Sequence, residues 1–394
     1  MKALISITLM LLLGVTQTGK SQEMVSSKQY LKRAEEMYSN IWKRYRVDKY
    51  KLFSENFPSG KQDSLTYLQG GSVNEKEVSF LWPFSGMFSA TNVLIKVPAV
   101  KNKYLVYLDS LSLGYETYKD TIRKPGGYQA YPVMLDKSDR YYDDNGLVAI
   151  DYAEAYISTK RPAYLKKAKE TFTFILSGWS DNIGGGVTWL EGHNDQKPAC
   201  SNGMATLSAL HLYKATNDPF YLNWGKRFYT WMHDNLRDST GVYWNDKKPD
   251  GSINYTQWTY NSGTMLEAAV MLYEFTHDIS YLKEAQAVAA GTFKHFTAQN
   301  KKPTLQLHID LPWFVTVLYR GYERLYHIDG NETYIKAVIK SLDYAWENSR
   351  DKYGLITHSW TPDAKELEKP KWLLDEACIA ELYARISMLK LSKK

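Results

Sequence analysis

Two adjacent aspartates, Asp143 and Asp144, are the residues whose types and spacing most directly suggest chemistry. They follow two tyrosines, and a helical pattern begins immediately after them. Cleavage of a glycosidic bond needs two carboxyl groups, one that donates a proton and one that attacks the sugar or activates water. Two like charges this close resist being ionised together, so one group can hold a proton near neutral pH. The spacing favours a retaining mechanism, although aspartates at this place can also simply cap a helix.

Aromatic, amide and acidic side chains recur in other segments that lead into helical patterns. Sugars stack their C–H faces on aromatic rings, while amides and carboxylates bind their hydroxyl groups. The 12 Trp and 31 Tyr residues of the chain suit a carbohydrate groove on this basis. We expect the following residues to contact a substrate: Trp189, Asn202, Trp258, Tyr260 and Asn261. The sequence leaves open whether Trp82, Trp313 and Trp360 are groove platforms or buried packing residues.

Several other polar residues favour structural interpretations. The glycine run 184–186 lacks the Lys-Ser/Thr of a phosphate-binding loop. His193 has no second His at ligand spacing, so a loop hydrogen bond is favoured over a metal site. Glu191 is either a sugar ligand or a solvated acid, and Asp310 and Asp375 each precede a helical run that they are expected to cap. We expect neither a metal nor a cofactor.

Four helical segments share a motif that predicts how the chain is built. In each, a Tyr is followed eight residues later by a second Tyr and an aliphatic residue, with turn signals such as Thr216-Asn217-Asp218-Pro219 between them. Each unit therefore predicts a helical hairpin whose two tyrosines pack across the turn. The pairs are Tyr156 with Tyr164, Tyr213 with Tyr221, Tyr273 with Tyr281, and Tyr326 with Tyr334.

Four further helical patterns complete the predicted fold, at residues 28–46, 84–96, 103–120 and 375–391. With the four hairpins they make twelve helices. Because the first and last helices lack partners unless they pair with each other, we expect an all-α protein with a closed (α/α)6 barrel of six hairpins. An open solenoid is the alternative. No linker rich in Pro, Gly or Ser interrupts residues 22–394, which we expect to be a single catalytic domain.

The composition indicates where the chain acts and which partners it lacks. Met1-Lys2 and the apolar run 3–15 resemble a secretory signal, expected to span 1–21, so we expect export to the periplasm or the medium. No cysteine lies there, so no lipid anchor is expected, and Cys200 and Cys378 are too few for a disulfide scaffold. Basic residues are scattered despite a net charge of +6, which argues against nucleic-acid binding. We expect a monomer that binds an oligo- or polysaccharide.

Four ordered motifs resemble glycoside hydrolase family 76, the α-1,6-mannanases. They are Asp143-Asp144-Asn145, Gly185-Gly186-Val187-Thr188-Trp189, Ala199-Cys200-Ser201-Asn202-Gly203 and Trp258-Thr259-Tyr260-Asn261-Ser262-Gly263. The resemblance covers nearly all of residues 22–394 and implies a substrate of α-1,6-linked mannose. It further implies that Asp143 is the nucleophile, that Asp144 is the general acid/base and that Asp246 helps to hold the sugar. The chain departs from the family at Gly146-Leu147, where members often place a small or apolar residue followed by Trp.

Two other functions remain as alternatives from the sequence. A glycan-binding protein of a polysaccharide-uptake system needs aromatic platforms but no adjacent acids. Another (α/α)6 sugar enzyme, such as an unsaturated glucuronyl hydrolase or a sugar epimerase, needs a different acidic or a His-based set of residues. The sequence does not decide between internal and terminal cleavage, because that depends on which loops block the ends of the groove.

Overall fold

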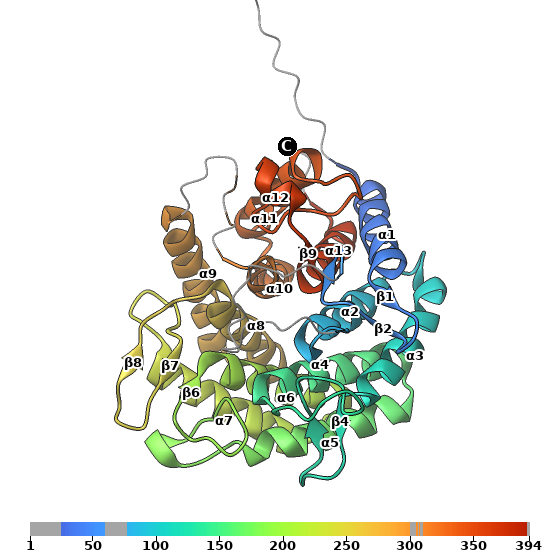
Figure 1. The fold of residues 1–394 in the computed structure, drawn as a ribbon. Coiled ribbons are helices and arrows are strands. Elements are labelled where there is room, and N and C mark those ends of the chain that lie inside the picture. The colour runs from blue at the N-terminus through green and yellow to red at the C-terminus, as the bar shows by residue number, and fades with distance from the viewer. Residues whose placement is uncertain (1–24, 60–76, 300–304, 306, 308–309, 392–394) are drawn as a thin grey trace, which may run out of the picture.

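The computed structural model describes residues 25–59, 77–299, 305, 307 and 310–391. The expected signal segment, residues 1–21, lies outside these described residues. Helices make up most of the described chain, whereas its strands are pieces of two residues each. Figure 1 shows the helices arranged in a ring, with the chain running once around it from blue to red.

Six helices form the inner ring, and their residues are buried almost throughout. Each helix packs on the next, and the last packs on the first, so the ring is closed. A helix that is largely apolar around its circumference suits this position because little of it faces water. The inner helices are α2 (Leu81–Leu94), α4 (Tyr142–Thr159), α6 (Ala199–Thr216), α8 (Thr259–Thr276), α10 (Pro312–Asp329) and α13 (Leu373–Ser387).

Six outer helices cover this ring, and each packs mainly against one inner helix. The first of them packs on α13, the last inner helix, as predicted for residues 28–46 and 375–391. The closed (α/α)6 barrel is therefore confirmed, and the open solenoid is wrong. The outer helices are α1 (Ser27–Arg44), α3 (Lys101–Glu116), α5 (Pro162–Ser177), α7 (Pro219–Leu236), α9 (Ile279–Gln299) and α11 (Thr333–Asn348).

A short additional helix, α12 (Ala364–Glu368), is not predicted by the sequence periodicity. Its five residues are too few to show a helical repeat. Asp363 caps it, because the Asp363 side chain accepts a hydrogen bond from the backbone N–H of Lys365 at 2.8 Å. The helix lies in the long loop between α11 and α13.

The repeated tyrosine motif marks the joints between inner and outer helices. Four inner helices end in a residue with left-handed backbone, and its N–H donates to the carbonyl of the first motif tyrosine at 2.7–2.8 Å. In two of the four hairpins, the second motif tyrosine does not stack on the first, as expected, but on a tyrosine one helical turn before it. Tyr164 stacks on Tyr152, and Tyr334 stacks on Tyr322. The motif is thus structural, as expected. The four left-handed residues are Lys160, Asn217, His277 and Gly330.

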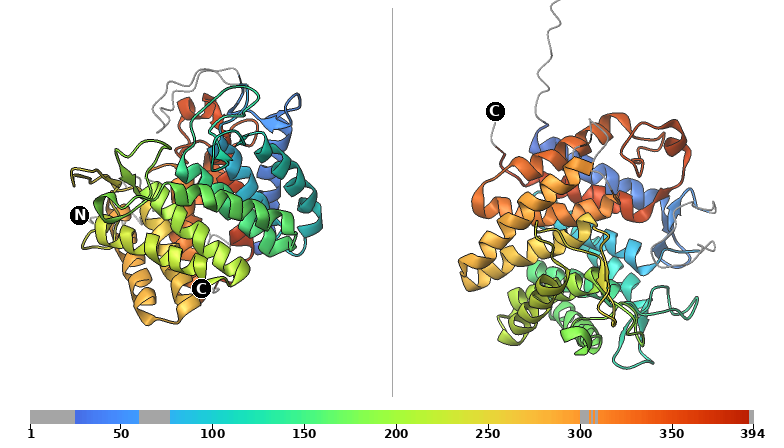
Figure 2. Two further views of the ribbon diagram at one scale, coloured as in Figure 1. Left: turned by 90° about the horizontal axis from the view of Figure 1, so that it is seen from below. Right: turned by 90° about the vertical axis from the view of Figure 1, so that its left-hand side faces the viewer.

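The short strands lie in the loops that lead into the inner helices, and these loops gather at one end of the barrel (Figure 2). All the pairings are antiparallel, and that of β3 with β9 joins the loop after α1 to the start of α13. The strands are β1 (Arg46–Val47) with β2 (Leu52–Phe53), β3 (Asn56–Phe57) with β9 (Lys371–Trp372), β4 (Lys119–Asp120) with β5 (Gly127–Tyr128), and β6 (Lys197–Pro198), β7 (Asp246–Lys247) and β8 (Ile253–Asn254) as one sheet.

Candidate active site

A pocket of about 190 Å³ lies where the inner helices begin. The second residue of five inner helices lines it: Trp82, Asp143, Cys200, Tyr260 and Trp313. Side chains in a helix lean toward its N-terminus, so those of the first turn project beyond the helix end. Because these five helices begin at the same end of one ring, their equivalent side chains converge on a single space.

The fourth residue of four inner helices ties that helix to the preceding loop. Its side chain accepts a hydrogen bond from a loop backbone N–H, with distances of 2.7, 2.7, 3.0 and 3.3 Å. The pairs are Asn145 with Tyr128, Asn202 with Val187, Ser262 with Tyr243, and Glu376 with Ile356. These bonds hold the loops against the helix ends and thereby place the second-residue side chains at the pocket.

Asn202, expected to contact substrate, belongs to this second group and does not line the pocket. Its amide nitrogen donates to the carbonyls of Val187 and Pro198 at 2.9 and 2.8 Å, and its oxygen accepts from Val187 N–H. The side chain is fully buried, so its bonding groups are turned toward the backbone rather than a ligand. Asn145 makes the same three kinds of bond next to the acid pair.

Asp143 and Asp144 occupy the second and third positions of α4, and both line the pocket. The N-cap of α4 is Tyr141, so the capping alternative does not describe either residue. Asp143 is half-buried and accepts hydrogen bonds from Trp189 Nε1 at 3.1 Å and from the Asp144 backbone N–H at 3.0 Å. Burial raises the pKa of Asp143, and hydrogen bonds from Cys200, the Asp144 N–H and Trp189 oppose this rise.

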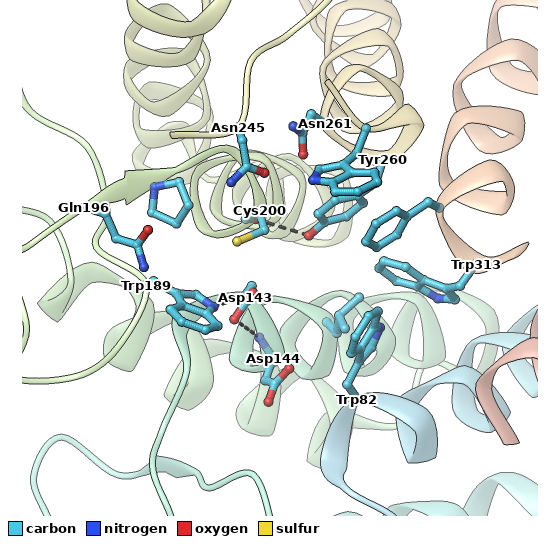
Figure 3. A pocket seen from close by; sticks show the side chains of 14 residues that line it. Trp82, Asp143, Asp144, Trp189, Gln196, Cys200, Asn245, Tyr260, Asn261 and Trp313 are labelled. Atoms are coloured by element: carbon cyan, nitrogen blue, oxygen red, sulfur yellow. Dashed lines mark hydrogen bonds between the residues drawn. The ribbon is translucent and has the colours of Figure 1, made fainter. Parts of the chain in front are cut away.

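Aromatic side chains line the pocket on both sides of the acid pair. Figure 3 shows Trp189 on one side of the pair and Trp82 and Trp313 on the other. Trp82 packs edge-on against Trp313 with ring centroids 5.4 Å apart. Both tryptophans therefore line the pocket, whereas Trp360, which the sequence also left open, is fully buried packing. Of the expected substrate-contacting residues, Trp189, Trp258, Tyr260 and Asn261 line the pocket.

Sequence reasoning missed several pocket residues, and most stood next to a residue that it had selected. Pro198 and Cys200 flank a motif alanine, Asn245 precedes Asp246, and Phe314 follows Trp313. Leu147 also lines the pocket, which places the family departure at Gly146-Leu147 directly on the binding surface. The missed residues are Leu147, Gln196, Pro198, Cys200, Asn245 and Phe314.

Asp246 lies behind the pocket wall and is not one of its lining residues. Its Oδ2 accepts hydrogen bonds from the side-chain amides of Asn245 and Asn254, both at 2.9 Å. Asn245 itself lines the pocket, so Asp246 orients a residue that can meet a ligand. The expectation that Asp246 helps to hold the sugar stays a prediction, and at this position its effect on a ligand would pass through Asn245.

Two expected helix caps have other roles. Asp310 accepts hydrogen bonds from the backbone N–H and the hydroxyl of Thr259, both at 2.8 Å, and so binds the first residue of α8 rather than capping α10. Burial raises the pKa of Asp310 to about 7. Asp375 is the third residue of α13 and contacts His358 Nδ1 at 2.7 Å. Helix capping was predicted because both aspartates precede a helical pattern, and a position in the sequence does not reveal hydrogen-bond partners from distant segments.

The other polar candidates from the sequence, Glu191 and His193, lie outside the pocket lining. Glu191 pairs with Arg140 outside the pocket lining, and His193 is exposed. Within the described ranges, no group of three or more His, Cys, Asp or Glu residues could hold a metal ion. No helix in that part of the chain is long and apolar enough to cross a membrane. Cys200 and Cys378 are free thiols.

Comparisons with known proteins agree on one family. The family described as Glycosyl hydrolase family 76 matches residues 62–309. The mannan endo-1,6-alpha-mannosidase DCW1 of Saccharomyces cerevisiae is 26% identical over 190 residues, 44% of this chain and 42% of that protein. The chain spans about half the length of the curated relatives it matches.

Solved structures share the fold over nearly the whole chain. The family 76 mannosidase Bt3792 from Bacteroides thetaiotaomicron VPI-5482 has a TM-score of 0.81 and 26% identity, covering 91% of this chain and 98% of that one. An inactive double-aspartate variant of the alpha-1,6-mannanase GH76A from Salegentibacter sp. HEL1_6, in complex with alpha-1,6-mannotetrose, has a TM-score of 0.73 and 22% identity over 92% and 99% of the chains. The family match, covering most of the chain, shows that this protein belongs to glycoside hydrolase family 76 and is a glycoside hydrolase.

Proposed function

We propose that this protein hydrolyses α-1,6-linked mannose chains with retention, through a covalent mannosyl-enzyme intermediate. The observation that carries the proposal is the adjacent acid pair at the floor of an aromatic pocket. Three hydrogen-bond donors, Trp189, Cys200 and the Asp144 N–H, meet the Asp143 carboxylate and favour its charged form. A half-buried carboxylate with fixed partners is suited to be the nucleophile, and we assign the proton to the neighbouring Asp144.

The two acids divide the reaction into two displacements. An Asp143 oxygen attacks the anomeric carbon, the glycosidic C–O bond breaks, and Asp144 transfers its proton to the leaving oxygen. Asp144, now ionised, removes a proton from water while the water oxygen attacks the anomeric carbon and breaks the ester to Asp143. The sugar that was bound to Asp143, mannose or a manno-oligosaccharide, is released, and both acids return to their starting states.

Mannan as the substrate is supported by the relatives as well as the pocket. The curated relative from yeast bears the name mannan endo-1,6-alpha-mannosidase, and a structural neighbour holds alpha-1,6-mannotetrose. The lining offers rings for stacking against sugar faces and side-chain amides for their hydroxyls. We assign these contacts to Trp189, Trp258, Tyr260 and Asn261, with Asn202 and Asp246 acting behind the surface.

The organisation of the whole protein belongs to the same proposal. We propose that residues 22–394 form one catalytic domain that acts as a monomer in the periplasm or the medium after removal of residues 1–21. A glycan-binding protein would not need the adjacent acids, and membership in a hydrolase family favours the enzyme.

Product analysis on debranched α-1,6-mannan tests the proposed activity. Thin-layer chromatography should show mannose or manno-oligosaccharides that accumulate with time. A ladder of products would indicate internal cleavage, and one small product would indicate terminal attack. Release from a β-linked mannan but not from the α-1,6 polymer would contradict the proposed linkage.

A further inference from the structure

Two chain segments run side by side at the edge of the pocket, one leading to the acid pair and one carrying Trp189. The Tyr142 N–H donates to the Trp189 carbonyl at 2.9 Å, and the Glu191 N–H donates to the Arg140 carbonyl at 3.1 Å. Tyr141 and Leu190 form the antiparallel bridge between these bonds. A pairing this short is weak by itself, because isolated two-stranded pairs are marginally stable in water.

An ion pair spans the same two segments and reinforces them. Arg140 is fully buried, and its Nε donates to Glu191 Oε2 at 2.8 Å while its Nη2 contacts Glu191 Oε1. A buried guanidinium left without its carboxylate is strongly unfavourable, so Arg140 restricts where Glu191 can lie. The fork of two parallel bonds also sets the orientation of the carboxylate plane.

The Arg140 guanidinium also contacts a loop carbonyl and an outer helix. Its Nη1 donates to the Pro125 carbonyl at 2.9 Å, and its guanidinium lies over the Phe174 ring at 4.8 Å from the centroid. Phe174 belongs to the outer helix α5. These two contacts oppose a movement of the Arg140 guanidinium with Glu191 if the Trp189 segment shifts.

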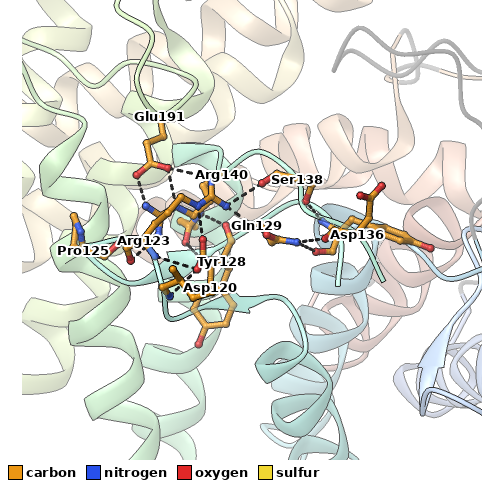
Figure 4. A network of polar contacts seen from close by, with 12 residues as sticks. Asp120, Arg123, Pro125, Tyr128, Gln129, Asp136, Ser138, Arg140 and Glu191 are labelled. Atoms are coloured by element: carbon orange, nitrogen blue, oxygen red, sulfur yellow. Dashed lines mark hydrogen bonds and ion pairs between the residues drawn. The ribbon is translucent and has the colours of Figure 1, made fainter. Parts of the chain in front are cut away.

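A second arginine also contacts the Glu191 carboxylate, as Figure 4 shows. Arg123 Nη1 lies 3.5 Å from Glu191 Oε2, and its Nη2 donates to the Ser138 carbonyl at 3.0 Å. Arg123 also pairs with Asp120. The alternating charges tie Glu191 to the loop between β4 and β5 and to the segment just before Arg140.

This arrangement bears directly on Asp143, because Trp189 stands two residues before Glu191. The indole Nε1 of Trp189 reaches Asp143 Oδ2 at 3.1 Å, near the upper end of ordinary hydrogen-bond distances. A shift of the segment by about 1 Å would break this bond. The ion pair lies outside the pocket lining, so its influence on catalysis passes through the two segments that it joins, one carrying Trp189 and one leading to Asp143.

We propose that the Arg140–Glu191 pair is a positioning clamp that holds the indole of Trp189 against the nucleophile Asp143. The proposal rests on the proposed role of Asp143. The sequence suggested that Glu191 is either a sugar ligand or a solvated acid. The proposal gives it a third role, because its carboxylate is paired with Arg140 and lies outside the pocket lining.

Glu191→Gln tests the clamp, because glutamine keeps the size of the side chain and removes its charge. A matched control is Glu284→Gln, since Glu284 pairs with Arg237 in a similar two-bond geometry of 2.5 and 3.2 Å, away from the pocket. Both variants should lower the melting temperature. Only Glu191→Gln should lower kcat on debranched α-1,6-mannan, by on the order of 10-fold or more, because small misplacements near reacting groups are costly.

The pH profile separates positioning from a merely structural role. The titratable groups that face Asp143 are Asp144, Tyr141, Cys200 and Tyr260, and Glu191→Gln leaves all four in place. If Trp189 moves away, Asp143 loses a donor to its charged form, so the acidic limb of kcat/KM should shift to higher pH. Glu284→Gln should leave this limb unchanged. Arg140→Lys, which keeps the charge but not the fork, should reproduce the shift.

Hydrogen exchange provides a readout that does not depend on activity. The Glu191 and Tyr142 amides should exchange faster in Glu191→Gln and Arg140→Lys than in the wild type or Glu284→Gln. Wild-type kcat with an unshifted acidic limb in a folded Glu191→Gln protein would overturn the clamp, as would equal effects of Glu191→Gln and Glu284→Gln. A wild-type protein inactive on mannan would instead count against the proposed function, while the exchange rates would still report on the clamp.

Discussion

At the scale of single residues, the two adjacent acids should differ in a way that chemistry can expose. Asp143→Asn and Asp144→Asn should each lower turnover of mannan by about 10²-fold or more while the helical circular dichroism spectrum persists. With an activated aryl mannoside, whose leaving group needs little protonation, Asp144→Asn should recover bond cleavage and Asp143→Asn should not. Equal defects on both substrates would contradict the division of roles.

The stereochemistry of the product follows from the closeness of the same pair. Adjacent residues of one helix turn cannot easily separate their carboxyl groups by the roughly 6.5 to 9.5 Å that admits water for inversion, whereas about 5 to 5.5 Å suits direct attack. Proton NMR of the first product from α-mannan should therefore show the α-anomer before mutarotation. If the β-anomer came first, one of the two catalytic acids would have to be another residue.

Trp189 should set the pH range in which the nucleophile is ionised. Burial raises the pKa of Asp143, and the Trp189 hydrogen bond is one of several that oppose the rise. Trp189→Phe keeps a ring but removes the donor, so the pKa of Asp143 should rise further. Because the carboxylate must be charged, activity lost as pH falls should be lost at a higher pH in the variant. An acidic limb of kcat/KM at the wild-type pH would show that this bond is not made in solution.

At the scale of elements, the fourth residue of an inner helix should matter more for stability than for catalysis. Asn202→Ala leaves the buried N–H and carbonyl of Val187 without their partner, which should lower the free energy of unfolding by about 3 kcal/mol. Urea denaturation measures this, with the exposed Asn194→Ala as control. A stable Asn202→Ala protein with no activity would instead indicate a direct contact between Asn202 and substrate.

Among the helices and loops, predictions from the sequence succeeded for local features and failed for contacts between distant segments. Helical periodicity and the tyrosine motif are local, so the hairpins were predictable from neighbouring residues. Asp310 precedes α10 in sequence but binds the first residue of α8, a contact between segments about fifty residues apart. No local pattern distinguishes such an acid from a cap, because capping preferences depend only on the adjacent helix.

At the scale of the whole molecule, contacts between the two ends of the chain close the ring. Arg33 of α1 pairs with Asp343 and Glu347 of α11 at 2.6 and 2.9 Å, and Tyr30 donates to Asp343 at 2.7 Å. Arg33→Ala removes the partner of a largely buried carboxylate and should lower the free energy of unfolding by roughly 2 to 4 kcal/mol.

Whether Arg33→Ala unfolds in one transition or in several shows whether the closed ring unfolds as a unit. If the closed ring unfolds as one unit, circular dichroism and activity should decline together at a lower urea concentration in Arg33→Ala. Separate transitions, with early loss of some helix and retained activity, would show that α1 detaches independently of the barrel.

Residue types and short spacings were enough to predict the helical content, the hairpin repeat, the acid pair and the aromatic character of the site. These properties depend on residue type and on spacings of a few residues, which a linear pattern records. Three-dimensional contacts were needed to establish that the second residues of five inner helices meet at one pocket, that Asn202 and Asp246 lie behind its surface, and that Glu191 pairs with a buried arginine. The reason is physical: convergence requires the ring to close, and closure joins segments that share no sequence proximity.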